Sequence, residues 1–271
     1  MPRQLKAPLT KNSKAVLADA LAAVGQYGAA SPRATIREKV EALTSFLAFC
    51  RLVENKGCVF VGMDPGLINF GWAIFAILPN GERVFCDAGC NKVISGTTAD
   101  NDSVVMSTQI NHFIAMVVER IPVQLKSLPI RFLVEKQFPK PAYNFVAKKF
   151  APPSKKLRQV MEVQNVVVTV LDTRLKGSVE TANPLHVSKY WKTRYGQYLL
   201  NVKASREDQK AKRRQYNAKK ENAMTLMEIL GASGTIQRFD GKNSKNHHIC
   251  DASLIAIACM DWVQAGQAIE Y

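Results

Sequence analysis

The chain has 271 residues, enough for one large domain with or without a small appendage, and 47% of them are hydrophobic, enough for a buried core. It carries 37 Lys and Arg against 22 Asp and Glu, a net charge of +15, so nucleic acid is the first candidate partner and an anionic membrane surface the second. No apolar run reaches the ~18 residues of a membrane span, no secretory signal is present, and six cysteines without a C-x-x-C pair favour free thiols in a reducing compartment.

The sequence of residues 1–52 predicts a short arm followed by two helices. Residues 1–12 are expected to be a disordered arm. An Ala/Leu-rich helix follows over 13–26, with Ser13 as its N-cap and Gly25 near its end. Residues 34–52 carry apolar side chains at spacings of three and four, which predicts an amphipathic helix. The pair serves either for packing or dimer contact, or as a small DNA-binding module, and the sequence does not decide between them.

Three strands are predicted next. The buried run 58–63 ends at Asp64-Pro65-Gly66, and two further strands over 70–78 and 83–88 are joined by the turn Pro79-Asn80-Gly81. The following elements are a helix over 102–121, a strand over 130–135, a helix over 155–175, a strand over 183–188, a basic helix within 203–230 and a last helix over 249–264. This order predicts an α/β fold with a mixed sheet.

Three acidic residues fall where these elements end or begin. Asp64 closes the first strand, Glu135 closes the fourth, and Asp251 lies in the last helix. Strand ends that meet at one edge of a sheet form the usual cleft of such folds. Gathered carboxylates repel one another unless a cation neutralises them, and their hard oxygen atoms suit Mg²⁺ or Mn²⁺. Two such ions are a common means of cleaving a phosphodiester.

His248 lies three residues before Asp251, so both side chains can share the first turn of the last helix. A neutral imidazole there can bind a metal or relay a proton. The alternative is a histidine in a polar loop, since residues 243–248 are all polar or charged, and His247 is expected to point elsewhere.

Several motifs resemble a known family. Val61 to Gly66, with Asn69-Phe70-Gly71 after it, resembles the first motif of RuvC-like Holliday junction resolvases, and Val134 to Gln137 resembles the E-[KR]-Q motif of their fungal mitochondrial and poxvirus branch. Leu157 to Gln164 and Pro184 to Trp191 are similar to later segments of the fungal mitochondrial enzymes, and His248-x-x-Asp251 to their closing helix. The resemblance covers roughly residues 58–264.

The resemblance implies a ribonuclease H-like fold, with a mixed five-stranded sheet flanked by helices and preceded by the helical pair. It implies a metal-dependent endodeoxyribonuclease that cuts four-way DNA junctions by paired symmetric nicks and acts as a homodimer in mitochondria. The catalytic and metal-binding set would be Asp64, Glu135, His248 and Asp251, with two Mg²⁺ or Mn²⁺ ions. The implied division is an arm over 1–12, a helical module over 13–55 in the position of a SAP-like module, and a nuclease domain over 56–271.

The chain departs from the family pattern in two places. The fungal relatives carry Asp where this chain has His248, which makes the site less anionic and favours Mn²⁺ relative to Mg²⁺. The linker from Gly25 to Arg33 lacks the Ser-Gly-x-Lys run of a SAP-like module, which puts DNA binding by the helical pair in doubt.

Basic residues flank the proposed cleft in the sequence. These residues either form a solvated surface or contact the phosphates of the junction arms. The aromatic residues Tyr143, Phe145 and Phe150, interleaved with the first group, would serve as a wedge at the junction centre or as core. The predicted nucleic-acid contacts are Lys136, Gln137, Lys140, Lys148, Lys149, Lys155, Lys156, Arg158, Lys203, Arg206, Lys210, Lys212, Arg213 and Arg214.

Two alternatives to a junction resolvase stay open. One is another ribonuclease H-like nuclease that acts on RNA–DNA hybrids or flaps. The other is a non-catalytic nucleic-acid-binding protein that has kept the fold, although clustered carboxylates facing phosphate would benefit a pure binding protein little.

Overall fold

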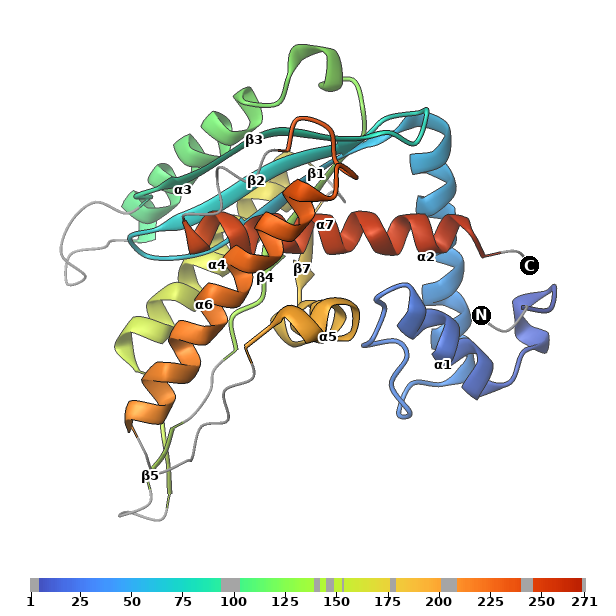
Figure 1. Cartoon of the computed structure of the whole chain (residues 1–271), viewed down its shortest axis with the longest axis horizontal. Helices are drawn as coiled ribbons and strands as arrows, with labels where there is room; N and C mark the ends of the chain where they lie inside the picture. The colour runs from blue at the N-terminus through green and yellow to red at the C-terminus, as the bar shows by residue number, and fades with distance from the viewer. Residues whose placement is uncertain are drawn as a thin grey trace.

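The structure is a computed structural model of the whole chain, shown in Figure 1. It describes residues 5–93, 103–138, 142–144, 149–152, 154–175, 179–200, 209–239 and 246–269.

A five-stranded mixed sheet forms the centre of the molecule. Its strands are β1 (Cys58–Asp64), β2 (Phe70–Ile77), β3 (Arg83–Asn91), β4 (Ile130–Glu135) and β7 (Val179–Ala182). They lie in the order β3-β2-β1-β4-β7. The first three strands form an antiparallel meander, whereas β4 runs parallel to β1 and β7 parallel to β4. This confirms the predicted ribonuclease H-like mixed sheet.

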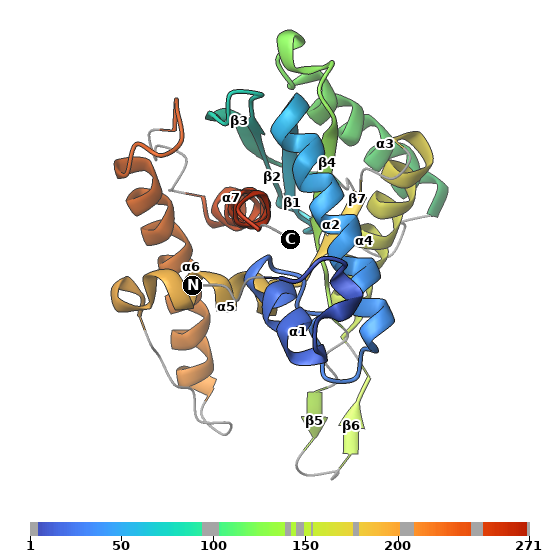
Figure 2. The same ribbon diagram turned by 90° about the vertical axis from the view of Figure 1, so that its right-hand side faces the viewer.

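Helices cover both faces of the sheet (Figure 2). One face carries α2 (Ile36–Lys56), α5 (Pro184–Tyr195), α6 (Gln209–Ala232) and α7 (His247–Gln267), and the other carries α3 (Ser103–Glu119) and α4 (Lys155–Arg174). Because both faces are covered, β1 and β2 are buried along their whole length. The described residues also include the short 3₁₀ turns η1 (Leu9–Lys11), η2 (Val123–Leu125) and η3 (Gly196–Tyr198).

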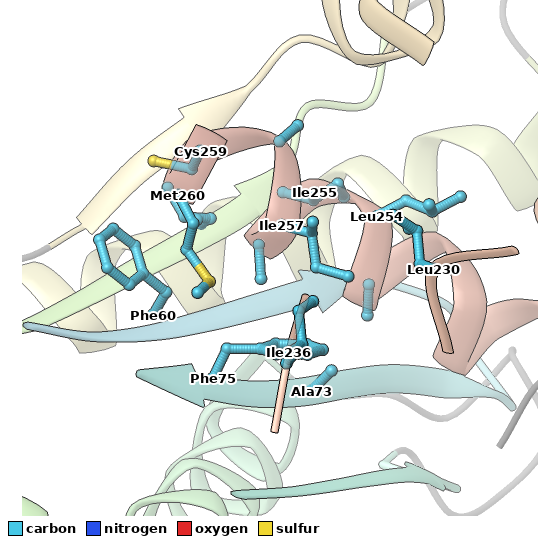
Figure 3. Close-up of a cluster of buried hydrophobic side chains, with 14 of the residues drawn as sticks. Phe60, Ala73, Phe75, Leu230, Ile236, Leu254, Ile255, Ile257, Cys259 and Met260 are labelled. Carbon is cyan, nitrogen blue, oxygen red and sulfur yellow. The ribbon is translucent and has the colours of Figure 1, made fainter. Parts of the chain in front are cut away.

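The central helix α7 lies directly on β1 and β2. Figure 3 shows Phe60, Ala73 and Phe75 of these strands packed beneath apolar side chains of α7. Two glycines permit the close approach: a Cβ on Gly62 would lie 2.0 Å from the carbonyl oxygen of Ala252, and one on Gly71 would lie 2.2 Å from that of His248. The N-terminal half of α7 is therefore fixed against the sheet by backbone contact.

By length and composition α7 could cross a membrane, with a mean hydropathy of 1.3 over its most apolar window. The sequence predicted no apolar run of the ~18 residues that a membrane span needs. However, 72% of that window is buried inside the protein, so α7 is accounted for as the core helix on the sheet.

The strand predicted over 183–188 is wrong. The fifth strand of the sheet is β7, and residues 184–195 form α5 instead. Asn183 caps this helix through a bond from the Leu185 amide, and Pro184 occupies its first turn, where a missing N–H costs nothing. Val187 and Trp191 are buried while Lys189 between them is exposed, which fits a helix face and not a strand, where all three would share one side.

A small hairpin lies outside the central sheet and was not predicted. Its strands are β5 (Ala142–Asn144) and β6 (Lys149–Ala151), paired antiparallel with Tyr143 opposite Phe150. In Figure 2 the hairpin extends away from the body of the molecule.

The N-terminal helices are more ordered and more tightly attached than expected. Within residues 5–12, predicted to be a disordered arm, Leu5 and Leu9 are buried against the first two helices. Helix α1 (Lys14–Ala23) begins at the predicted cap Ser13, whose side chain accepts from the Val16 amide. The second half of α2 contributes Cys50 and Val53 to the same core cluster as α7.

We expect Gly62→Ala to lower the free energy of unfolding by about 1–3 kcal/mol, because the added methyl group forces α7 away from β1. Urea denaturation measures the change. Gly28→Ala is the control, since nothing lies within 4 Å of a Cβ at that position, and it should shift stability by less than about 0.5 kcal/mol. Equal stability of the two variants would contradict this account of helix packing.

Candidate active site

Asp64 and Glu135 lie side by side at one edge of the sheet. They are the last residues of β1 and β4, which are parallel neighbours paired up to Met63 and Val134. Parallel strands place their carboxyl ends at the same edge, so the chain brings these two acids together across 71 residues of sequence. This is the arrangement that the positions of the two acids predicted.

The first turn of α7 adds His248 and Asp251. The helix starts at His247, and its N-cap Asn246 accepts a hydrogen bond from the His248 amide at 3.0 Å. His248 Nδ1 lies 3.0 Å from Asp64 Oδ2, with both side chains mostly buried. The glycine at position 71 makes this contact possible, because any side chain there would displace the backbone of His248. Nε2 of His248 lies on the far side of the ring from this contact.

His247 takes a different position from the expected one. Its ring packs against that of His248, with centroids 4.0 Å apart and planes inclined by 37°. Burial, His248 and Lys220 lower the pKa of His247. The ring of His247 therefore packs beside His248, and its lowered pKa favours the neutral imidazole.

The three carboxyl groups disfavour one another's charge. Burial, the charge of Asp64 and a hydrogen bond with Asp64 raise the pKa of Glu135 well above its usual value. Burial, followed by the charge of Asp64, raises the pKa of Asp251 to about 6. Asp251 also contributes to the shift of Glu135, so all three acids belong to one electrostatic cluster.

This cluster has the donor chemistry for a hard divalent cation. Three carboxylates and an imidazole offer oxygen and nitrogen ligands, and a cation would offset both the burial and the repulsion that raise the pKa values of Glu135 and Asp251. Among the described residues, however, no three His, Cys, Asp or Glu side chains already stand in the geometry of a complete cation site. Asp64 makes hydrogen bonds to both Glu135 and His248, contacts that compete with metal coordination.

Two lysines of α6 lie near the acids, and sequence reasoning counted them only as part of a basic helix. Lys219 lowers the pKa values of Glu135 and Asp251, and Lys220 that of Asp251. They stand one turn before Ala223, which is buried against α7 in the main core cluster, so the helical repeat turns them towards the same side. Glu135 lies more than 80 residues before these lysines in the sequence, and Asp251 lies about 30 residues after them. No local sequence pattern therefore identifies the two lysines as neighbours of the acids.

Gln164 is a second residue that sequence reasoning did not single out. It is 8% exposed, and its Oε1 accepts a hydrogen bond of 2.7 Å from the Gln137 amide. On the other side, the Lys136 amide donates to the Ala182 carbonyl of β7 at 2.8 Å. The two residues after Glu135 are thus held from both sides, which fixes where the Glu135 side chain begins.

The predicted nucleic-acid contacts are only partly described. Lys136, Lys155, Arg158 and Arg214 are exposed, and Gln137 is half-buried. The backbone of four others belongs to α4 or α6, and that of one to β6: Lys156, Lys210, Lys212, Arg213 and Lys149. The remaining four lie outside the described residues: Lys140, Lys148, Lys203 and Arg206. Phe145, one of the three aromatic residues of the predicted wedge, also lies outside them.

Comparisons with known proteins find similarity in structure alone. No protein-family model and no curated protein sequence matches the chain. The crystal structure of the yeast mitochondrial Holliday junction resolvase Ydc2 matches with a TM-score of 0.55 and 10% identity, covering 94% of this chain and 96% of that one. This likeness shows a shared fold. Two structures of Thermus thermophilus RuvC, one in complex with a Holliday junction substrate, match at 16% identity with TM-scores of 0.44 and 0.43, covering 77% of this chain and 97% of those chains.

We expect Asp251→Asn to stabilise the protein in EDTA at pH 8 by about 1–2 kcal/mol, a value reduced from the full pKa shift because Asp251 is partly exposed. The folded-state pKa of about 6 exceeds the ordinary 3.8, so ionisation of Asp251 weakens the fold as the pH rises from about 4 to about 6. Asparagine removes that loss. Urea denaturation should therefore show that the wild type and Asp251→Asn are equally stable at pH 4 and that Asp251→Asn is the more stable protein at pH 8.

We expect Gln164→Met to speed hydrogen exchange of the Gln137 amide by about tenfold, because the variant removes its acceptor while keeping the side-chain length. Gln164→Glu keeps an acceptor oxygen and should retain the protection. Exchange followed by mass spectrometry or NMR measures both. Identical protection in the wild type and in both variants would show that Gln164 does not hold this segment.

Proposed function

We propose that this protein is a RuvC-like Holliday junction resolvase of the fungal mitochondrial branch, a metal-dependent endonuclease that cuts four-way DNA junctions. The convergence of Asp64, Glu135, Asp251 and His248 at one edge of a ribonuclease H-like sheet carries the proposal. The order of the sequence motifs supports it, as does the shared fold with a mitochondrial Holliday junction resolvase.

In this proposal Asp64, Glu135 and Asp251 would hold two divalent cations, Mg²⁺ or Mn²⁺, which would supply Lewis-acid chemistry for phosphodiester hydrolysis. Asp64 is central because it contacts both Glu135 and His248. Glu135 and Asp251 flank it from β4 and α7. Burial and the charge of Asp64 raise the pKa of both acids, and a cation would favour their ionised forms, so cation binding would strengthen as the pH rises.

His248 has a second role in this scheme. Its Nδ1 is engaged by Asp64, so only Nε2 is left to bind a cation or to accept a proton from water. The stacked ring of His247 and the capped helix start hold the imidazole in that orientation. Replacement of a carboxylate by an imidazole favours Mn²⁺ relative to Mg²⁺.

The positive charge of the chain supplies the affinity for DNA. Exposed Lys136, Lys155, Arg158 and Arg214 would contact junction phosphates. Lys219 and Lys220, whose charges act on Asp251, would lie near the reacting phosphate. A homodimer would place two such sites on two strands and produce paired nicks with ligatable ends. The mitochondrion is the proposed compartment, by the same resemblance.

The alternatives explain less of the molecule. A non-catalytic binding protein would gain nothing from three carboxyl groups gathered beside two lysines, since the acids repel phosphate and two of them disfavour their own ionisation. A nuclease for RNA–DNA hybrids or flaps would use the same acids, so only the choice of substrate separates it from a resolvase.

We expect the wild-type protein with Mg²⁺ or Mn²⁺ to place paired, symmetric, ligatable nicks in a labelled four-way junction and to leave duplex DNA intact. Asp64→Asn should reduce the rate by about a thousandfold or more, since it removes the central ligand of the cluster. Asp172→Asn, an exposed change on α4, is the matched control and should cut normally.

Three outcomes would contradict the proposal in different ways. Faster cutting of an RNA–DNA hybrid would indicate a different nuclease of the same fold. Tight junction binding by both the wild type and Asp64→Asn, without cutting by either, would indicate a binding protein. Equal cutting by Asp64→Asn and the wild type would place the active site elsewhere.

A further inference from the structure

Helix α5 leaves the sheet at the candidate active site. The last residue of β7, Ala182, is paired in register with Glu135, and α5 begins two residues later at Pro184. The Asn183 cap and Pro184 fix the turn between the strand and the helix. The direction of α5 is therefore set by the strand that stands next to Glu135.

The inner face of α5 packs against the hydrophobic core. Val187 and Trp191 are buried, and Trp191 Nε1 donates to the Leu254 carbonyl of α7 at 3.2 Å. Tyr190 and Arg194 both bond the buried carboxylate of Asp261, which also receives Arg83 at 2.7 Å. These contacts hold α5 rigidly on α7.

The outer face of α5 carries positive charge that no acidic side chain among the described residues neutralises. Lys189 and Lys192 lie three residues apart on one face, and both are exposed. From Thr181 to Leu200 the chain has no acidic residue, and among the described residues neither lysine forms an ion pair, in contrast to Arg194. Lys189 makes a cation–π contact with Tyr27, whose ring centroid lies 5.4 Å from the Lys189 Nζ.

Tyr27 belongs to the loop between α1 and α2, so the helical module supports this face. Its ring packs on His186 of α5, with centroids 4.7 Å apart, and lies 6.3 Å from that of Trp262 on α7. Lys189 is thus positioned at the line where the module meets α5. In Figure 1 α5 lies between α6 and the N-terminal helices.

We propose that the outer face of α5, through Lys189 and Lys192, binds the phosphate backbone of the duplex arm that leaves the active site. This inference rests on the proposed function, which places the reacting phosphate of the DNA at the acidic cluster. With a rise of 1.5 Å per residue, the two lysines stand roughly 8 and 12 Å along the helix from Pro184. Phosphates follow one another every 3.4 Å of axis along a strand, so the contacts fall roughly two to four nucleotides from the reacting phosphate.

The test is the salt dependence of binding to a four-way junction in EDTA, measured by fluorescence anisotropy without cleavage. We expect the double reversal Lys189→Glu, Lys192→Glu to weaken binding about tenfold or more and to reduce the slope of log K against log salt by about two. Both side chains are exposed, so the melting temperature should be unchanged.

The matched control is Lys126→Glu, Arg174→Glu. Lys126 precedes β4 and Arg174 ends α4, both are exposed, and the double change alters the net charge by the same amount at the opposite edge of the sheet. Its salt slope should equal that of the wild type. Equal weakening in both double variants would reduce the effect to total charge and overturn the proposal.

Unchanged DNA binding in Lys189→Glu, Lys192→Glu would also overturn it and would assign the face to another partner, such as an acidic protein surface. The result is separable from the proposed function. If the wild type binds the junction through α5 but never cuts it, the α5 surface stands and the nuclease proposal fails. If the wild type cuts the junction and Lys189→Glu, Lys192→Glu leaves the salt slope unchanged, the nuclease proposal stands and the α5 proposal fails.

Discussion

The repulsion among Asp64, Glu135 and Asp251 is the constraint that the candidate site depends on. Each acid alone could be solvated at the end of its element. Burial, and then the charge of Asp64, raise the pKa of Glu135 and Asp251, so ionisation of these two acids is unfavourable at this edge. Such a cluster persists only where the surrounding structure is rigid enough to impose it.

That rigidity comes from α7 and its glycine contacts. Gly62 and Gly71 let the first half of the helix rest on the backbone of β1 and β2, and the buried side chains in Figure 3 complete the contact. The same helix reaches the N-terminal module at its other end, where Gly266 packs against Cys50 and Phe46 of α2. Helix α7 therefore joins the acidic cluster to the helical pair as one packed body, and the pair is part of the architecture around the site.

The electrostatics of the molecule fall into two scales. At long range the net charge of +15 favours a polyanionic partner, while at the site itself three acids stand among a few lysines. A nuclease needs both, because phosphate must be attracted to the protein and then meet a cation held by carboxylates. Lys219 and Lys220 lie at the boundary between the two scales, close enough to the acids to lower their pKa values.

The amino-acid sequence by itself determined most of the elements, the class of the sheet and the acidic set. Asp64 and Glu135 could be identified because each ends a buried apolar run, and His248 and Asp251 because a spacing of three puts them on one helical turn. These are local patterns, fixed by residues close in the chain. Only the tertiary structure decided that β7 precedes α5, that Gln164 holds the segment after Glu135, that Lys219 faces the acids and that Tyr27 lies beneath Lys189. Each of these depends on packing between segments far apart in the chain, and the energy of such contacts leaves no periodic trace in either partner's sequence.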